Sequence, residues 1–319
     1  MNTKVAELAG RVASGMEGVL VGADGVTLGL LIALLSRGHV LIEGVPGTGK
    51  TLAVRMLALL LGLDFRRIAF TPDLMPSDVI GTTVFNPQTA QFSTRTGPIV
   101  ANVVLADEVN RTPPKTQSAL LEAMEEGRVT IDGVAFALPQ PFLLCATQNP
   151  IEYEGTYPLP EAQLDRFLVQ VESSYPAEAQ ELELLARAAA GFDARALEAS
   201  NVAPVTSAAD IIEAQAEVRR VHLSDSVRDY TYRIVASTRA NRRLTLGASP
   251  RAGVHLLVAS QASAAIQSRD FVTPDDVKDV TDLVLAHRLI VAPEAEIEGV
   301  SAHAVLQEVL ASVVVPRSS

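Results

Sequence analysis

The stretch His39-Val-Leu-Ile-Glu-Gly-Val-Pro-Gly-Thr-Gly-Lys-Thr51 is the strongest structural signal in this 319-residue chain. It begins as an apolar run, passes into the spacing G-x-x-x-x-G-K-T and continues into Thr51–Leu61, whose Leu, Ala and Met spacing predicts a helix. A strand, a glycine-rich turn and a helix in this order let backbone N–H groups and the positive end of the helix approach a phosphate. We therefore predict nucleotide binding by a continuous loop. Its residues are Gly44, Val45, Pro46, Gly47, Thr48, Gly49, Lys50 and Thr51.

Two of these residues have side chains suited to a nucleotide and its metal. Lys50 adds a positive charge for the β- and γ-phosphates, and Thr51 offers a hydroxyl to Mg²⁺. We therefore expect ATP and Mg²⁺ as the ligands of this loop.

A second signal is the apolar run Val103-Val-Leu-Ala106, which ends in the adjacent carboxylates Asp107 and Glu108. In a parallel sheet the carboxyl ends of the strands face the ligand crevice. Asp107 can then hold the metal beside Thr51, while Glu108 can orient and deprotonate a water for attack on the γ-phosphate. Asp-Glu after a strand is often only a solvated turn, and the upstream loop favours the catalytic interpretation.

Three further polar residues have weaker signals. Asn149 follows the apolar run Phe142–Thr147 and either hydrogen-bonds the γ-phosphate or begins a turn before Pro150. Arg166 and Arg251 could each stabilise developing charge or pair with a nearby acid, and their spacing does not decide between these roles.

The first half of the chain alternates apolar runs with helical patterns, which predicts an α/β domain with a largely parallel sheet. Two segments interrupt the alternation. Gly127–Leu138 predicts a hairpin with an Asp132-Gly133 turn, whereas Thr82–Pro98 supports only a loop or an irregular hairpin. The predicted strands are His39–Glu43, Val100–Ala106, Phe142–Thr147 and Phe167–Val171, and Pro114–Glu126 is a further predicted helix.

The second half changes to Ala- and Glu-rich helical patterns, so we expect a small all-helical domain there. Asn201–Thr206 is the predicted linker, and the predicted domains are residues 1–200 and 201–319. The predicted helices are Ala177–Ala190, Ala208–Val221, Ser224–Ala240, Pro250–Ser268 and Thr273–His287.

The composition excludes several classes of protein. Lys and Arg number 26 against 37 Asp and Glu, a net charge of −11, and aromatics make up 4%, which disfavours a dedicated nucleic-acid binder. The longest apolar stretch near the N-terminus, Val26–Leu35, is too short to span a bilayer. No export signal precedes it and Cys145 is the single cysteine, so we expect a cytoplasmic protein without membrane insertion.

With these motifs in place, the chain resembles the MoxR-type members of the AAA+ ATPases. The resemblance covers nearly the whole sequence. It rests on the opening stretch and on Phe70–Asp78, Gly97–Arg111, Pro113–Met124, Ala146–Phe167 and Gly247–Ala252.

The resemblance assigns a role to each candidate residue. It implies that Lys50 and Thr51 belong to Walker A, and Asp107 and Glu108 to Walker B. It also implies sensor 1 for Asn149, the arginine finger for Arg166 and sensor 2, in a helical lid, for Arg251.

The resemblance further implies an ATP hydrolase that forms a homo-oligomeric ring, expected to be a hexamer. Such a ring would remodel or activate a client protein, one with a von Willebrand factor A domain or one receiving a cofactor or metal. Two alternatives stay open: a DNA-acting ring motor of the helicase kind, and a nucleotide-dependent scaffold that does not hydrolyse. The acidic balance disfavours the first alternative and the presence of Glu108 the second.

Overall fold

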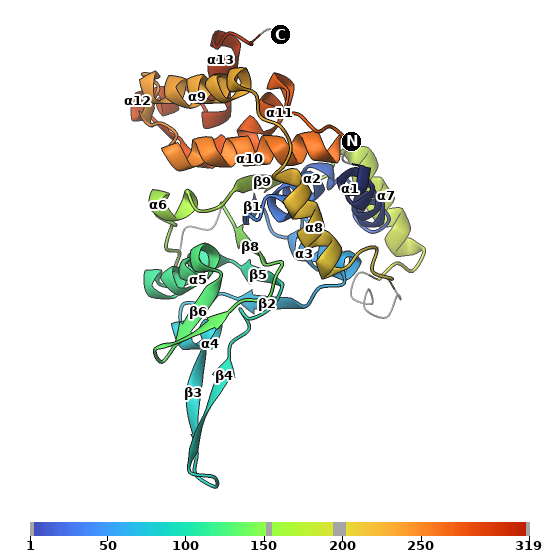
Figure 1. Cartoon of the computed structure of the whole chain (residues 1–319), viewed down its shortest axis with the longest axis vertical. Coiled ribbons are helices and arrows are strands. Elements are labelled where there is room, and N and C mark those ends of the chain that lie inside the picture. The colour runs from blue at the N-terminus through green and yellow to red at the C-terminus, as the bar shows by residue number, and fades with distance from the viewer. Residues whose placement is uncertain (1–2, 151–154, 194–201, 317–319) are drawn as a thin grey trace.

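The computed structural model describes residues 3–150, 155–193 and 202–316 (Figure 1). At its centre lies a five-stranded sheet of order β2-β5-β8-β1-β9, in which all neighbouring strands run parallel. The strands are β1 (Val40–Gly44), β2 (Phe65–Ala69), β5 (Val103–Asp107), β8 (Leu143–Gln148) and β9 (Val169–Ser173). Four of them overlap the predicted runs, with boundaries shifted by one to three residues, so the predicted α/β core with a parallel sheet is confirmed.

The fifth strand, β2, is absent from the sequence prediction. Its sequence, Phe-Arg-Arg-Ile-Ala, places two arginines where a buried parallel strand would have apolar residues. As the edge strand it pairs only with β5, so both arginines can reach solvent.

The two faces of the sheet belong to separate hydrophobic clusters. In β1, Val40 and Ile42 pack with α1 (Thr3–Glu17), α2 (Asp24–Leu35) and α3 (Lys50–Leu61). Leu41, between them in the sequence, packs on the opposite side with α4 (Pro76–Ile80) and α5 (Pro114–Glu126). Because side chains alternate across a strand, one short apolar run anchors both layers.

Helix boundaries follow the residues expected to set them. Helix α5 runs over Pro114–Glu126 as predicted, with Pro114 in its first turn and Gly127 left-handed at φ 60° after its end. The apolar stretch Val26–Leu35 falls within α2, which is buried along most of its length.

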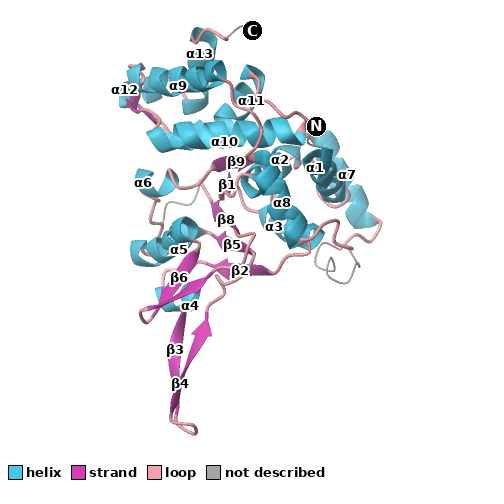
Figure 2. Ribbon diagram, viewed as in Figure 1, coloured by secondary structure: helices cyan, strands magenta, loops and turns pink. Residues whose placement is uncertain are grey.

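Two hairpins extend from the core on the side of α4 and α5 (Figure 2). β6 (Arg128–Ile131) and β7 (Val134–Ala137) form the predicted one, with Asp132 and Gly133 both at positive φ in the turn. The second, β3 (Gly81–Asn86) with β4 (Gln91–Thr96), is a regular antiparallel hairpin of six pairs, which the sequence supported only as a loop or an irregular hairpin. Its strands are exposed along most of their length, so they lack the apolar–polar alternation that marks a half-buried strand.

The C-terminal region is helical, as predicted. It adds one short antiparallel ribbon, β10 (Leu244–Leu246) with β11 (Ile290–Val291), whose strands are too short to produce an alternating pattern. Its α-helices are α8 (Ala208–Val218), α9 (Asp225–Ala240), α10 (Pro250–Ile266), α11 (Pro274–Leu285), α12 (Pro293–Ile297) and α13 (Ala302–Ser312).

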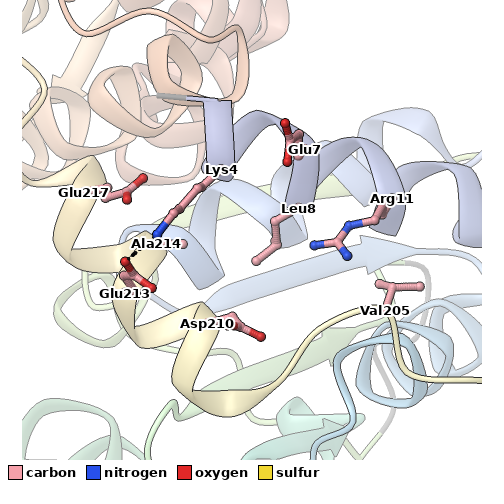
Figure 3. Close-up of a pocket in the computed structure, with 9 residues that line it drawn as sticks. All are labelled: Lys4, Glu7, Leu8, Arg11, Val205, Asp210, Glu213, Ala214 and Glu217. Atoms are coloured by element: carbon pink, nitrogen blue, oxygen red, sulfur yellow. Dashed lines mark hydrogen bonds and ion pairs between the residues drawn. The ribbon is translucent and has the colours of Figure 1, made fainter. Parts of the chain in front are cut away.

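The predicted boundary between residues 200 and 201 lies outside the described residues, and so does the first residue of the predicted linker. Beyond it, α8 packs against α1 and α2 as well as α10. Between α1 and α8 lies a groove of about 330 Å³ lined mostly by charged side chains, where Lys4 Nζ is 2.8 Å from Glu213 Oε1 (Figure 3). The C-terminal region therefore contacts the core through α8, which packs on α1 and α2.

Among the described residues, no helix is both long and apolar enough to cross a lipid bilayer. The thiol of Cys145 is buried in β8, and this burial raises its pKa. Cys145 therefore acts as a small core residue, as its place in an apolar run predicts.

His39, just before β1, is a buried polar side chain that fastens three elements together. Its Nδ1 accepts the N–H of Leu144 in β8 at 3.1 Å, so its Nε2 carries the proton and donates to the carbonyl of Met124 in α5, also at 3.1 Å. Burial lowers the pKa of His39 from its ordinary 6.5 to about 4. The ring is therefore neutral in the folded protein at neutral pH.

We predict that this histidine weakens the fold in acid. As the pH falls below 6.5 the unfolded chain takes up the proton first, so stability present at neutral pH is lost progressively toward pH 4. From pH 7 to pH 5, His39 alone should lower the free energy of unfolding by about 2 kcal/mol. Urea titrations at both pH values measure this, and His39→Gln, which keeps a donor and an acceptor, should show a smaller loss. Equal losses in both proteins would mean that His39 is not held neutral.

Candidate active site

The loop between β1 and α3 has the backbone shape that an anion site requires. Gly47 and Gly49 both adopt left-handed conformations, at φ 85° and 83°, which only glycine enters without strain. A Cβ on Gly44 would lie 2.3 Å from the carbonyl oxygen of Ser173, so the close approach of β1 to β9 also needs glycine. The eight residues predicted to bind nucleotide form one continuous loop at the carboxyl end of β1, and it leads into the N-terminus of α3.

Lys50 folds back over this loop. Its Nζ donates to the carbonyl oxygens of Gly44 and Val45, at 2.7 Å each. Partial burial lowers the pKa of Lys50, while the charges of Asp107 and Glu108 act in the opposite direction, so both acids lie within electrostatic range of the ammonium group. The structure thus brings the two sequence signals to one place.

One hydroxyl organises the acidic pair. Thr147, in β8, donates from Oγ1 to Asp107 Oδ1 at 2.6 Å and accepts the backbone N–H of Glu108 at 2.8 Å. Glu108 itself has a positive φ of 58°, a conformation uncommon for a residue with a side chain and often found at functional sites. Sequence reasoning did not single out Thr147, because its role depends on the neighbouring strand β5 rather than on its own sequence context.

Both acids also contact arginines of the same chain. Arg67 in β2 donates to Asp107 Oδ2 from Nε at 2.9 Å and from a terminal nitrogen at 2.5 Å. Arg111, in the short 3₁₀ turn Val109–Arg111, lies 2.9 Å from Glu108 Oε2. The two carboxylates are therefore fixed from several sides, and Arg67 is a second site residue that sequence reasoning missed.

The residues present fit a magnesium ion that is shared with phosphates. Thr51, in the first turn of α3, and Asp107 supply the hard oxygen donors that Mg²⁺ prefers. Within the described ranges, no group of three or more His, Cys, Asp or Glu could hold a metal ion by itself. Such a donor set suits an ion that takes its remaining ligands from water and a nucleotide.

Asn149 follows the end of β8 and is buried. β8 lies between β1 and β5 in the sheet, so Asn149 is at the same edge as the loop and the acidic pair. The structure therefore brings Asn149 to the side of the sheet that the sequence predicted.

Arg166 and Arg251 lie elsewhere. Arg166 precedes β9, where Val169 pairs with Val40 at the start of β1, so it is at the amino end of the sheet while the loop is at the carboxyl end. A five-residue strand spans about 16 Å. Arg251, in the first turn of α10, shares a partner with Arg166: both contact Glu125 at the end of α5. Within one chain these two arginines are together and are separated from the nucleotide loop.

The turn between α1 and α2 borders the glycine loop. Sequence reasoning also missed this turn as part of the site. A Cβ on Gly49 would lie 4.0 Å from Leu20 Cδ2, so Leu20 forms an apolar wall beside the glycines. Helix α7 (Glu178–Ala189), another predicted helix, supports this turn, since Arg187 donates to the carbonyl of Gly18 at 3.1 Å. The signal in the sequence was weak, because it consists of two glycines and a few apolar residues.

Comparison with known proteins gives a consistent result. Residues 39–169 match the family model described as "ATPase family associated with various cellular activities (AAA)", and residues 236–309 match the AAA lid domain. The chain is 48% identical to the uncharacterized protein YeaC of Bacillus subtilis, over 97% of this chain and 95% of that protein. It is 42% identical to Chaperone MoxR1 of Mycobacterium tuberculosis, over 94% of this chain and 80% of that protein.

A solved structure has the same fold. A crystal structure from Cytophaga hutchinsonii, assigned to the ATPases, superposes with a TM-score of 0.88 at 40% identity, covering 99% of this chain and 98% of that one. The likeness extends over both the sheet and the helical C-terminal region.

We predict that Thr147→Val slows nucleotide hydrolysis without greatly weakening nucleotide binding. The substitution removes the donor to Asp107 and the acceptor for the Glu108 N–H, so both acids lose their alignment while the loop keeps its shape. The turnover number should fall by about 10- to 100-fold, because small misplacements at a reacting centre are costly. Steady-state kinetics and binding of a fluorescent nucleotide measure the two effects.

Thr147→Ser is the matched control, since it keeps the hydroxyl and should retain most of the rate. Similar rates for the Val and Ser variants would contradict the role given to this hydroxyl.

Proposed function

Because the chain belongs to the MoxR family of AAA+ ATPases, we propose that it hydrolyses ATP with Mg²⁺ at this loop and uses the cycle to remodel or activate a client protein. The observation that carries the proposal is the meeting of the glycine loop, the pair Asp107 and Glu108, and Asn149 at one edge of the sheet. We also propose that the chain forms two domains, residues 1–200 and 201–319, and that the protein is cytoplasmic.

Each residue at this edge has a distinct task. The loop amides and Lys50 bind the phosphates, and Thr51 and Asp107 hold the metal. The bound metal neutralises charge that develops on the phosphate oxygens. Glu108 orients a water and takes its proton, and Asn149 hydrogen-bonds the γ-phosphate or that water.

The arginines support a ring. Arg166 and Arg251 are paired at the amino end of the sheet, too far to reach the loop of their own chain. A guanidinium can stabilise the transferring phosphoryl group of a neighbouring subunit instead. Contacts that join the front of one subunit to the back of the next close into a ring when the rotation permits, and we propose six subunits.

The exposed hairpin β3–β4 supports a protein client rather than nucleic acid. Phe85 and Phe92 lie opposite each other in β3 and β4, with ring centroids 5.1 Å apart, and both are exposed. Arg95 is the one charged residue of these two strands, so they offer little to a phosphate backbone and much to an apolar segment of polypeptide. The relative named Chaperone MoxR1 supports the same class of partner. A client that contains a von Willebrand factor A domain or receives a cofactor or metal is the specific form of the proposal.

We predict that Lys50→Ala and Glu108→Gln separate binding from hydrolysis. Lys50 contacts ground-state phosphates, so Lys50→Ala should lose nucleotide binding at concentrations that saturate the wild type. Glu108 acts on the water, so Glu108→Gln should bind ATP normally and hydrolyse it about 10²- to 10⁴-fold more slowly. Equilibrium binding and phosphate release measure the two effects, and wild-type turnover in Glu108→Gln would overturn the assignment of the base.

The same Glu108→Gln protein tests the client. Loaded with ATP and captured from cells, it should carry a bound client protein. Wild-type protein under the same conditions should not retain that client, because it hydrolyses its nucleotide and releases the client. Recovery of nucleic acid in its place, or stimulation of the ATPase by DNA, would support the DNA-acting alternative.

We predict that two inactive variants restore each other. Arg166→Ala should bind ATP but hydrolyse it about 10³- to 10⁵-fold more slowly, as expected for the loss of such an arginine. Mixed with Lys50→Ala, it should regain activity, because its intact loop can meet an intact Arg166 from the Lys50→Ala subunit. Failure to recover over a range of ratios, with subunit exchange verified by labelling, would show that Arg166 serves its own chain.

A further inference from the structure

Glu125, the second-to-last residue of α5, contacts two arginines with a single oxygen. Its Oε1 lies 3.2 Å from Arg166 Nε and 3.0 Å from a terminal nitrogen of Arg251. The three residues come from α5, the segment before β9 and the first turn of α10, so the contact joins the core to the helical lid. The site borders a cavity of about 220 Å³ that Arg37 also lines.

The backbones that carry the two arginines are held by a common, partly buried acid. Asp165, next to Arg166, accepts the hydroxyl of Ser249 at 3.0 Å and the Nε of Arg288 at 2.9 Å. Ser249 caps α10 just before Arg251, and the Arg288 side chain is almost fully buried. The two main chains are therefore held in register, so what is left to be positioned is the pair of long side chains.

Glu125 is fixed in turn by the histidine that joins α5 to the sheet. The carbonyl of Met124, its neighbour in α5, accepts a hydrogen bond from His39. The end of α5 is thus tied to the start of β1, and the carboxylate has a defined place relative to the sheet.

A carboxylate at this position has a physical purpose. Two guanidinium groups repel each other when they converge, and one negative charge between them offsets that repulsion. The contact with Arg166 is made at Nε, whereas the contact with Arg251 is made at a terminal nitrogen. Each guanidinium has five N–H donors, so Glu125 can hold the two groups side by side while both keep further donors for a phosphate.

We propose that Glu125 is a positioning residue that holds Arg166 and Arg251 together for the nucleotide of the neighbouring subunit. This inference rests on the proposed function, since it requires the arginines to act across a subunit boundary. The surface that one subunit presents to its neighbour's nucleotide then carries a triad of one acid and two arginines, and the acid acts through the arginines.

The first test compares Glu125→Gln with Glu126→Gln. Glu126 is the adjacent residue at the same helix end, and its carboxylate pairs with Arg128 at 3.0 Å on the surface. Glu125→Gln should lower the turnover number by about 10- to 100-fold, leave the dissociation constant of a fluorescent ATP analogue within about twofold, and keep the thermal midpoint of wild type. Glu126→Gln should match wild type in all three. A normal or raised turnover number in Glu125→Gln would overturn the inference.

The second test asks which subunit needs Glu125. In the mixture of Lys50→Ala and Arg166→Ala proteins, the Lys50→Ala subunit donates the arginines. Adding Glu125→Gln to that subunit should abolish most of the recovered activity, whereas adding it to the Arg166→Ala subunit should leave the recovery unchanged. A merely structural role would lower the recovery in both arrangements, and that result would overturn the inference.

The failures are distinguishable. If the original mixture recovers activity and the placement of Glu125→Gln makes no difference, the inference about Glu125 is wrong and the ring proposal stands. If the original mixture does not recover after verified subunit exchange, the cross-subunit action of the arginines is wrong, and the inference falls with it.

Discussion

The parallel hydrogen bonds that join β1 to its neighbours β8 and β9 fix the two ends of the sheet at which the candidate residues gather. Parallel strands end at the same edge, so one edge collects the glycine loop, Asp107, Glu108 and Asn149. The opposite edge collects the turns that begin the strands, and there Arg166 and Arg251 meet. A single registration of the sheet thus gives the molecule two chemically different ends, one suited to bind phosphates and one rich in arginine.

Shared polar groups tie the elements together at each end. At the end with the glycine loop, the hydroxyl of Thr147 bonds to both acidic residues, so any shift of β8 relative to β5 would disturb Asp107 and Glu108 together. At the arginine end, Asp165 accepts hydrogen bonds from Ser249 and Arg288, which both belong to the lid. The charge of the buried Arg288 is offset by that carboxylate and by backbone carbonyls. Breaking either arrangement would leave buried polar groups without partners, which costs more than the intact bonds contribute. Both arrangements therefore hold the residues at the two ends of the sheet in fixed positions.

The hairpins are attached where they do not disturb the sheet. β3–β4 and β6–β7 each form a separate two-stranded sheet, outside the five-stranded core. The edge strand β2 leads toward the first of them, and the hydroxyl of Thr112, which follows the acidic pair, donates to the carbonyl of Thr71 at 2.7 Å. The hairpin β3–β4, which carries the aromatic pair, is thereby linked to the loop after Glu108 by a short stretch of backbone and one hydrogen bond.

Patterns along the chain were enough to predict the layered α/β core, the helical C-terminal region, the hairpin turned by Asp132-Gly133 and the candidate residues of the loop and acidic pair. These features are local: glycine positions, apolar periodicity and helix caps act over a few residues, so their spacing is readable along the chain. The strand β2, the role of the Thr147 hydroxyl and the contact of Arg67 with Asp107 depend on packing between distant segments and became visible only in the folded structure. The pairing of Arg166 with Arg251 through Glu125 was decided in the same way, because residues 125, 166 and 251 come together only when the sheet, α5 and the lid are packed. No periodicity records such a meeting, since contacts between distant segments depend on how whole elements pack and not on the residues beside them in the sequence.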